Sequence, residues 1–242
     1  MMNKEALFIA CAGRKGGSGK TAVALGLAAC FARKGARVLL VDLDPQGSAS
    51  LALGADADGE ALAGTLDGTA APVMVTIDTF SGCPPLSLLS GGPALERVDA
   101  AGDLRRLLAG IAADVVLMDC PPGHRNLDRL ALQAAAVALA CCEPHRMGIA
   151  GAARVLDEAA ALARPPQAAL VLCRVDARRS LDRAAPDLLA GAFAVPVFHI
   201  RQDARLAAAL NAGTLPGPDG TAAADLEDLA RWIEKQNRRG TP

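Results

Sequence analysis

Hydrophobic residues along the chain form short, nearly continuous runs that alternate with longer stretches of helical periodicity. Such runs are typical of strands buried on both faces of a sheet. The expected strands cover Leu7–Ala12, Arg37–Val41, Leu86–Leu89, Asp114–Met118, Ala136–Cys142, Ala168–Cys173 and an extended Pro196–Ile200. The expected helices cover Lys20–Lys34, Pro93–Gly110, Leu127–Ala135, Ile149–Ala163, Leu181–Ala190, Ala204–Asn211 and Ala222–Gln236. The alternation predicts an α/β fold with a mostly parallel sheet and helices on both faces.

The chain reads as a single domain over residues 1–242, because no Pro-rich or Ser-rich linker divides it. The segment Gly54–Pro85 is rich in Gly, Ala, Asp and Thr and predicts loops and short elements. We expect no signal peptide, because Leu7–Cys11 is too short and runs directly into Gly13. No uncharged apolar stretch is long enough to span a bilayer, so we expect no membrane helix.

Composition narrows the possible functions. The formal net charge is −1, so any binding to nucleic acid must come from a local basic patch. Aromatic residues make up 2% of the chain, which argues against a stacking platform for single strands. The seven cysteines lack Cys-x-x-Cys spacing and mostly fall in apolar runs, which indicates buried thiols in a reducing compartment. Adjacent Cys141 and Cys142 would point to opposite faces of a strand.

A glycine-rich loop, Gly13–Thr21, joins the first expected strand to the first expected helix. Its glycines allow successive backbone N–H groups to surround phosphate oxygens, and the following helix adds its positive N-terminal end. Lys20 can reach the β- and γ-phosphates of a nucleotide, and the Thr21 hydroxyl can bind Mg²⁺. The residues expected to bind the nucleotide here are Gly16, Gly17, Ser18, Gly19, Lys20, Thr21 and Ala22.

Aspartates follow two further strands. Asp42 and Asp44 lie two residues apart, so they share one face while the chain is extended, and Asp119 ends the apolar run Val115–Met118. The carboxyl ends of parallel strands face the ligand crevice of such sheets. There, carboxylates can orient an attacking water or hold Mg²⁺ through water. The sequence thus predicts an ATP and Mg²⁺ site with Thr21, Asp42 and Asp119 around the metal.

The loop departs from the common P-loop pattern, which has glycine where this chain has Arg14. Its Lys-Gly-Gly-x-Gly-Lys-Thr form, with Asp-x-Asp-Pro-Gln-Gly and Asp-Cys-Pro-Pro further on, resembles the ParA/MinD family of deviant Walker A ATPases, especially its ParA subgroup. The resemblance covers nearly the whole chain. It implies an ATP-dependent dimer in which Lys15 contacts the nucleotide of the partner subunit. It also implies catalytic roles for Lys15, Lys20 and Asp44, with Asp44 positioning the water and Asp42 supporting the Mg²⁺ shell.

Other features follow from the same resemblance. The loop after Asp119 should sense the γ-phosphate, so His124 or Arg125 can couple nucleotide state to partners. ParA relatives bind double-stranded DNA without sequence preference, and a ParB-like or cargo-adaptor partner stimulates hydrolysis. We therefore expect a cytoplasmic, nucleoid-associated protein. The segment from Arg174 to Arg205 carries six arginines against four aspartates. By family position the candidate DNA contacts are Arg178, Arg183, Arg201 and Arg205. Arg174 follows a strand at the crevice side, so it is a candidate to line the adenine pocket of the nucleotide instead.

Two alternatives remain. A MinD-like membrane switch would need an amphipathic last helix, and Leu226, Leu229, Trp232 and Ile233 have helical spacing. That helix ends in polar residues, which favours docking on the domain instead. A metabolic enzyme on the same scaffold, such as an ATP-dependent ligase or kinase, lacks a further acid–base constellation in the sequence. The cargo, whether a chromosome, a plasmid or a protein assembly, is not encoded in these motifs.

Overall fold

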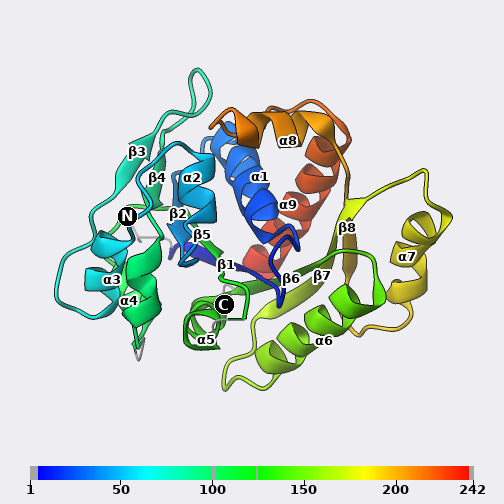
Figure 1. The fold of residues 1–242 in the computed structure, drawn as a ribbon, viewed down its shortest axis with the longest axis horizontal. Helices are drawn as coiled ribbons and strands as arrows, with labels where there is room; N and C mark the ends of the chain where they lie inside the picture. The colour runs from blue at the N-terminus through cyan, green and yellow to red at the C-terminus, as the bar shows by residue number, and fades with distance from the viewer. Residues whose placement is uncertain (1–4, 100–101, 124, 240–242) are drawn as a thin grey trace.

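The computed structural model describes residues 5–99, 102–123 and 125–239 of the chain. An eight-stranded sheet has the order β3-β4-β2-β5-β1-β6-β7-β8, shown in Figure 1. Every pairing is parallel except that of β3 with β4. The strands are β1 (Leu7–Ala12), β2 (Val38–Asp42), β3 (Val75–Ile77), β4 (Leu86–Leu89), β5 (Val115–Asp119), β6 (Val137–Cys142), β7 (Gln167–Val175) and β8 (Val197–Arg201). The mostly parallel α/β sheet is confirmed.

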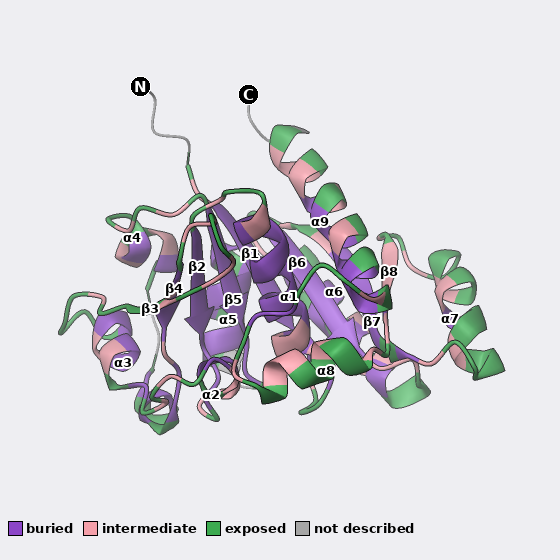
Figure 2. Cartoon of the chain, turned by 90° about the horizontal axis from the view of Figure 1, so that it is seen from above, coloured by how far each residue is buried: buried purple, intermediate pink, exposed green. Residues whose placement is uncertain are grey.

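Helices cover both faces of this sheet, and Figure 2 shows the buried strands between them. One face is covered by α1 (Lys20–Arg33), α2 (Ser48–Ala52), α8 (Ala204–Asn211) and α9 (Thr221–Arg239). The other carries α3 (Glu60–Leu66), the 3₁₀ helix η1 (Pro93–Arg97), α4 (Leu104–Leu108), α5 (Arg125–Ala134), α6 (Arg146–Ala160) and α7 (Ser180–Ala190). Since β1, β2, β5 and β6 are buried along their whole length, their apolar runs read as continuous rather than alternating.

The cysteines follow the two faces as predicted. Cys141 packs into the core beneath α1, and Cys142 packs into the core on the opposite face. All seven thiols are free, and only Cys83 is not buried. The six buried thiols act as small core side chains.

Helix α9 docks on the domain through its apolar face. Leu226, Leu229 and Ile233 are almost completely buried in the core with α1 and β8. Trp232 contacts Phe198 of β8, with 5.4 Å between the ring centroids. The docking predicted for this helix is therefore observed. Within the described residues, no helix is both long and apolar enough to cross a membrane.

The prediction of a single helix over Pro93–Gly110 is wrong. The chain forms η1, becomes extended at Val98, and begins α4 only after Asp103. The carboxylate of Asp103 accepts hydrogen bonds from the backbone N–H groups of Arg105 and Arg106, so it caps a new helix instead of lying inside a longer one. Helix α6 begins three residues earlier than predicted, at Arg146, because His145 caps it by accepting from the N–H of Gly148.

Candidate nucleotide-binding site

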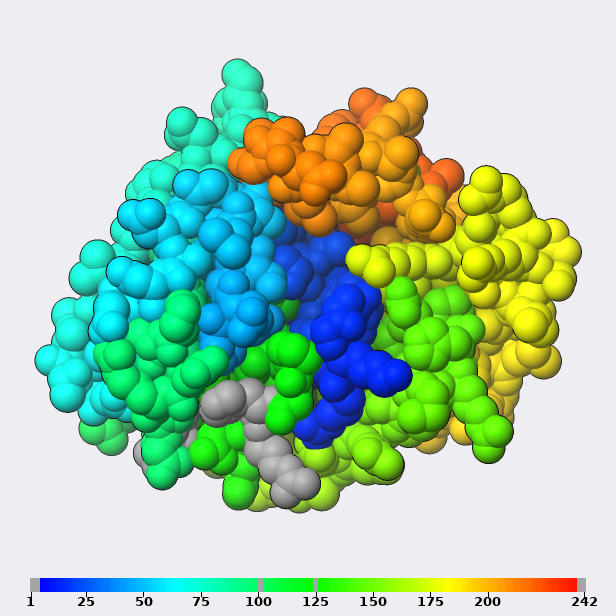
Figure 3. Space-filling model, viewed as in Figure 1, coloured from blue at the N-terminus to red at the C-terminus, as the bar shows by residue number. Residues whose placement is uncertain are grey.

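The phosphate loop follows β1 at the carboxyl edge of the sheet. Gly17 and Gly19 have φ values of 77° and 91°, a backbone region that side-chain-bearing residues rarely adopt. A Cβ on Gly19 would also lie 2.5 Å from the Cβ of Cys173 in β7. Lys15, Gly16 and Gly17 are exposed, and Figure 3 shows this part of the chain, in dark blue, open at the centre of one face of the molecule.

Within the loop, polar groups are turned inward. Lys20 is 5% exposed, and its Nζ donates to the carbonyl oxygen of Lys15 at 3.2 Å. The hydroxyl oxygen of Ser18 is buried and has no hydrogen-bond partner among the described residues. Since buried polar atoms are seldom left unpaired, this arrangement suits a ligand that supplies acceptors to both groups. Phosphate oxygens have that chemistry.

Thr21 and Asp119, the residues expected to bind Mg²⁺, lie in direct contact. The Thr21 hydroxyl donates to Asp119 Oδ2 at 2.6 Å, and Asp119 Oδ1 is buried without a partner within residues 5–99, 102–123 and 125–239. Burial, and then the neighbouring Asp42, raise the pKa of Asp119 to about 8. A divalent cation would favour the charged form and give the orphaned oxygen a partner. An oxygen-only donor set of this kind fits Mg²⁺.

Asp42 and Asp44 lie beside this pair at the end of β2. Asp42 Oδ2 accepts from the backbone N–H and the hydroxyl of Ser50, at 2.8 and 2.7 Å, and Oδ1 accepts from the N–H of Asp44 at 3.2 Å. Burial raises the pKa of Asp42 to about 6. Asp44 Oδ1 accepts from the N–H of Gln46 at 2.9 Å. Asp42 is thus held by protein donors, and Ser50 is a member of the site that the motifs did not indicate.

Arg174 lies on the rim of the site. A β-bulge between Cys173 and Val175 places Arg174 at φ 57°, and bulges beside active sites commonly redirect a side chain. Its Nη1 lies 3.2 Å from Glu143 Oε1. The same Nη1 would lie 3.9 Å from a Cβ on Gly17 of the phosphate loop. The structure therefore brings Arg174 close to the phosphate loop.

The four candidate DNA-binding arginines have different surroundings. Arg178 is 86% exposed and pairs with Asp176, and Arg183 is exposed on α7. Arg201 pairs through two nitrogens with Asp225 of α9, at 2.7 and 2.9 Å, so its charge is largely neutralised within the fold. Arg205 is exposed at the start of α8. The four arginines thus lie at or after the carboxyl ends of β7 and β8, the edge of the sheet that also carries the phosphate loop.

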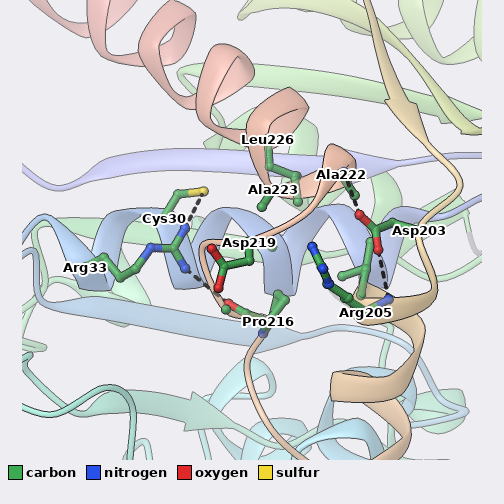
Figure 4. Close-up of a pocket in the computed structure, with 12 residues that line it drawn as sticks. Cys30, Arg33, Asp203, Arg205, Pro216, Asp219, Ala222, Ala223 and Leu226 are labelled. Carbon is green, nitrogen blue, oxygen red and sulfur yellow. Dashed lines mark hydrogen bonds between the residues drawn. The ribbon is translucent and has the colours of Figure 1, made fainter.

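Figure 4 shows the small cleft that Arg205 lines together with Asp203 and Asp219. Asp203 caps two helices at once: Oδ1 accepts from the N–H of Arg205, and Oδ2 accepts from the N–H of Ala222.

His124 and Arg125 are the residues expected to sense the γ-phosphate. His124 lies outside the described residues, and Arg125 is the first residue of α5.

A glycine-rich loop between a strand and a helix, a buried lysine, and a Thr–Asp pair beside it define a P-loop nucleotide-binding domain. A family model described as the CobQ/CobB/MinD/ParA nucleotide binding domain matches residues 9–216. The chain belongs to this family, which includes the ParA and MinD ATPases. The resemblance read from the three motifs is confirmed.

Individual relatives agree with this assignment. The chromosome-partitioning ATPase Soj of Thermus thermophilus is 37% identical over 68% of this chain and 67% of its own length. The maintenance of carboxysome distribution protein A of Synechococcus elongatus is 32% identical over 62% of this chain and 64% of its own length. The alignments therefore span about two thirds of the length of these relatives.

Solved structures share the fold across nearly the whole chain. Cobyrinic acid a,c-diamide synthase of Mycobacterium smegmatis, with a bound ATP analogue and magnesium, has a TM-score of 0.80 and 25% identity, covering 98% of this chain and 100% of its own. An ATP complex of McdA from Cyanothece has a TM-score of 0.81 and 19% identity, covering 96% of each chain. The second likeness is one of fold alone.

Proposed function

We propose that the chain is a Mg²⁺-dependent ATPase of the ParA type, which dimerises with ATP and binds double-stranded DNA without sequence preference. It would position a chromosome, a plasmid or a protein assembly on the nucleoid, in the cytoplasm, with a ParB-like or cargo-adaptor partner stimulating hydrolysis. The observation that carries the proposal is the phosphate loop with its two lysines, Lys20 buried with its ammonium donating back to the loop and Lys15 exposed on the surface. The names of the Soj and carboxysome-distribution relatives support the positioning role.

Each residue of the site has a place in this reaction. The N–H groups from Gly16 to Ala22 and the ammonium of Lys20 would hold the phosphates, while Thr21 and Asp119 would hold Mg²⁺, supported by Asp42. The metal would neutralise charge on the phosphate oxygens. Asp44, buried at the end of β2 but not tied up by Ser50, would orient the attacking water. Arg174 would line the nucleotide from the rim.

Replacing Asp44 with alanine should preserve ATP binding and dimerisation but reduce hydrolysis by about 100-fold or more, since a positioned base typically contributes that much. The ATP-bound dimer should then accumulate, which light scattering after gel filtration would measure. Adding Lys15→Ala to this variant should return it to monomer, because the exposed lysine would no longer reach the other subunit's nucleotide. A dimer that persists without Lys15 would remove its proposed role, and full turnover without Asp44 would do the same for the carboxylate.

DNA binding should require ATP and decline steeply with salt, because each phosphate contact releases counterions. Replacing Arg178, Arg183 and Arg205 together with alanine should abolish retention on a sequence-unrelated duplex at about 100 mM salt. Arg231→Ala is a matched control, because Arg231 is an exposed arginine on α9 that already pairs with Asp228. Equal loss in the control would point to general charge, and retention by the triple variant would place the DNA contact elsewhere.

The likeness to an amide-forming synthase keeps a metabolic enzyme as the second candidate. That activity would consume ATP in proportion to a carboxylate acceptor and would not need a polymer surface. Steady-state ATP turnover with and without duplex DNA separates the two. Failure of DNA to bind in either nucleotide state, with intact ATP binding, would favour the enzyme. A membrane switch has less support, because the apolar face of α9 is already covered.

A further inference from the structure

Arg14 occupies the loop position where the common P-loop pattern has glycine, and its side chain turns into the domain. Its side chain is 17% exposed. Nη1 donates to Asp128 Oδ2 of α5 at 3.2 Å, and Nη2 pairs with Glu158 of α6. Gly151 of α6 leaves room for this, because a Cβ there would lie 3.3 Å from the Cβ of Arg14. One side chain therefore links the phosphate loop to two helices.

Asp128 is the more deeply buried of the two carboxylates that pair with Arg14. Its side chain is 4% exposed, and its Oδ1 is buried without a hydrogen-bond partner in the part of the chain that the structure describes. Removing Arg14 leaves a buried carboxyl group without its cation, and removing Asp128 leaves the guanidinium without its buried partner, so Arg14 and Asp128 depend on each other strongly. Glu158 is 54% exposed and contributes less, because solvent screens it.

The phosphate loop contacts both ends of the segment from residue 119 to residue 128. At one end Thr21, the last residue of the loop, donates to Asp119 at 2.6 Å. At the other end Arg14, at the start of the loop, pairs with Asp128. Between them, the carbonyl oxygen of Arg14 would lie 3.9 Å from a Cβ on Gly123. The segment that joins the metal-site strand β5 to α5 is thus bracketed by the loop that would hold the phosphates.

We propose that Arg14 is a positioning residue that couples nucleotide binding at the phosphate loop to α5 and α6 through Asp128 and Glu158. This inference rests on the proposed ATPase function. Mg²⁺ and nucleotide would bind to Thr21 and Asp119, so the contacts of Asp119, at the first end of the segment, would change when the site is filled. The Arg14–Asp128 pair holds the other end of the segment, at the start of α5, against the start of the phosphate loop. A change at Asp119 therefore reaches α5 and α6 as well as the loop.

Substitutions that keep the shape of the pair but remove its charge test the coupling. Arg14→Gln and Asp128→Asn should each lower kcat for ATP about tenfold, equivalent to about 1.4 kcal/mol, with KM changed less than about threefold. The double variant should recover most of the lost kcat, since Gln and Asn can hydrogen-bond without leaving a lone charge. Arg129→Gln, at an exposed neighbour on α5, should leave kcat unchanged.

Amide hydrogen exchange supplies a readout that general destabilisation would not reproduce. In the unaltered protein, a non-hydrolysable ATP analogue with Mg²⁺ should slow exchange in the phosphate loop and in α5 and α6. In Arg14→Gln the loop should remain protected by nucleotide, while the response of α5 and α6 is lost. If the glutamine variant does not fold, Arg14→Lys replaces it in this experiment, because lysine keeps the charge but lacks the planar guanidinium that can pair with two carboxylates at once.

The outcomes separate this inference from the function on which it rests. If the unaltered protein does not bind ATP, the proposed function fails. If it binds ATP and the α5 and α6 response persists in the Arg14 variants, the coupling role is overturned. Additive losses in the double variant would also overturn it, because a coupled pair must be non-additive.

Discussion

Alanine at position 20 should abolish productive binding of Mg·ATP. Lys20 is buried, and its ammonium donates within the loop, so it is already directed to where the β- and γ-phosphates would lie. Each charge-assisted hydrogen bond is worth about 1.5–3 kcal/mol, so losing those to two phosphates should weaken affinity by at least about 100-fold. Calorimetric titration with Mg·ATP would measure the loss.

A second lysine in the same helix region controls for non-specific effects. Lys34 follows α1 and pairs with Glu227 and Glu234, away from the loop. Lys34→Ala should bind Mg·ATP as tightly as the unaltered protein. If Lys20→Ala retained affinity within about threefold, the phosphate role of Lys20 would be lost.

Raising the pH from 5 to 8 should lower the free energy of unfolding of the nucleotide-free protein. The pKa of Asp119 is about 8 and that of Asp42 about 6 in the folded chain, both raised mainly by burial from an ordinary value of 3.8. Between pH 3.8 and the pKa of each group in the folded chain, the folded protein keeps a proton that the unfolded chain has released. Stability is therefore greatest below pH 4 for these groups and falls as pH rises, by about 1.4 kcal/mol per pH unit for each retained proton.

Urea unfolding at several pH values, with and without Mg·ATP, would measure this dependence. Asp119→Asn should flatten the slope by about one proton, because the amide does not titrate. Mg·ATP should reduce the slope in the unaltered protein, since a bound cation favours the charged carboxylates. Stability that rises with pH over this range would show that Asp119 is not protonated in the apo site.

The parts of the fold and site that are local in sequence were predictable. The apolar runs located seven of the eight strands in the described part of the chain and missed the short, largely exposed β3. The Gly-Lys-Thr and Asp-Cys-Pro-Pro motifs led to Thr21 and Asp119, which the structure joins. Contacts between distant residues were not predictable, because no local pattern specifies a partner. Arg14 and Asp128 lie 114 residues apart. The sequence predicts Arg201 as a DNA contact, whereas in the structure it forms an ion pair with Asp225 of α9.

The split of the predicted helix at Pro93–Gly110 has a local cause that periodicity hides. Apolar residues at helical spacing continue through the segment, but an aspartate that can accept from two backbone N–H groups starts a new helix there. Ser50 was missed for a related reason. A single serine after a Gly-containing turn gives no signal until the fold brings its hydroxyl to Asp42.

The contact between Trp232 and Phe198 makes the protein a natural optical reporter. The chain has no tyrosine and only this one tryptophan, so its near-ultraviolet emission comes from a single place, where α9 meets β8. Asp225 of the same helix holds Arg201 at the end of β8. Emission that changes when nucleotide or duplex is added would therefore report a movement at this junction, without a label and without any background from the phosphate loop.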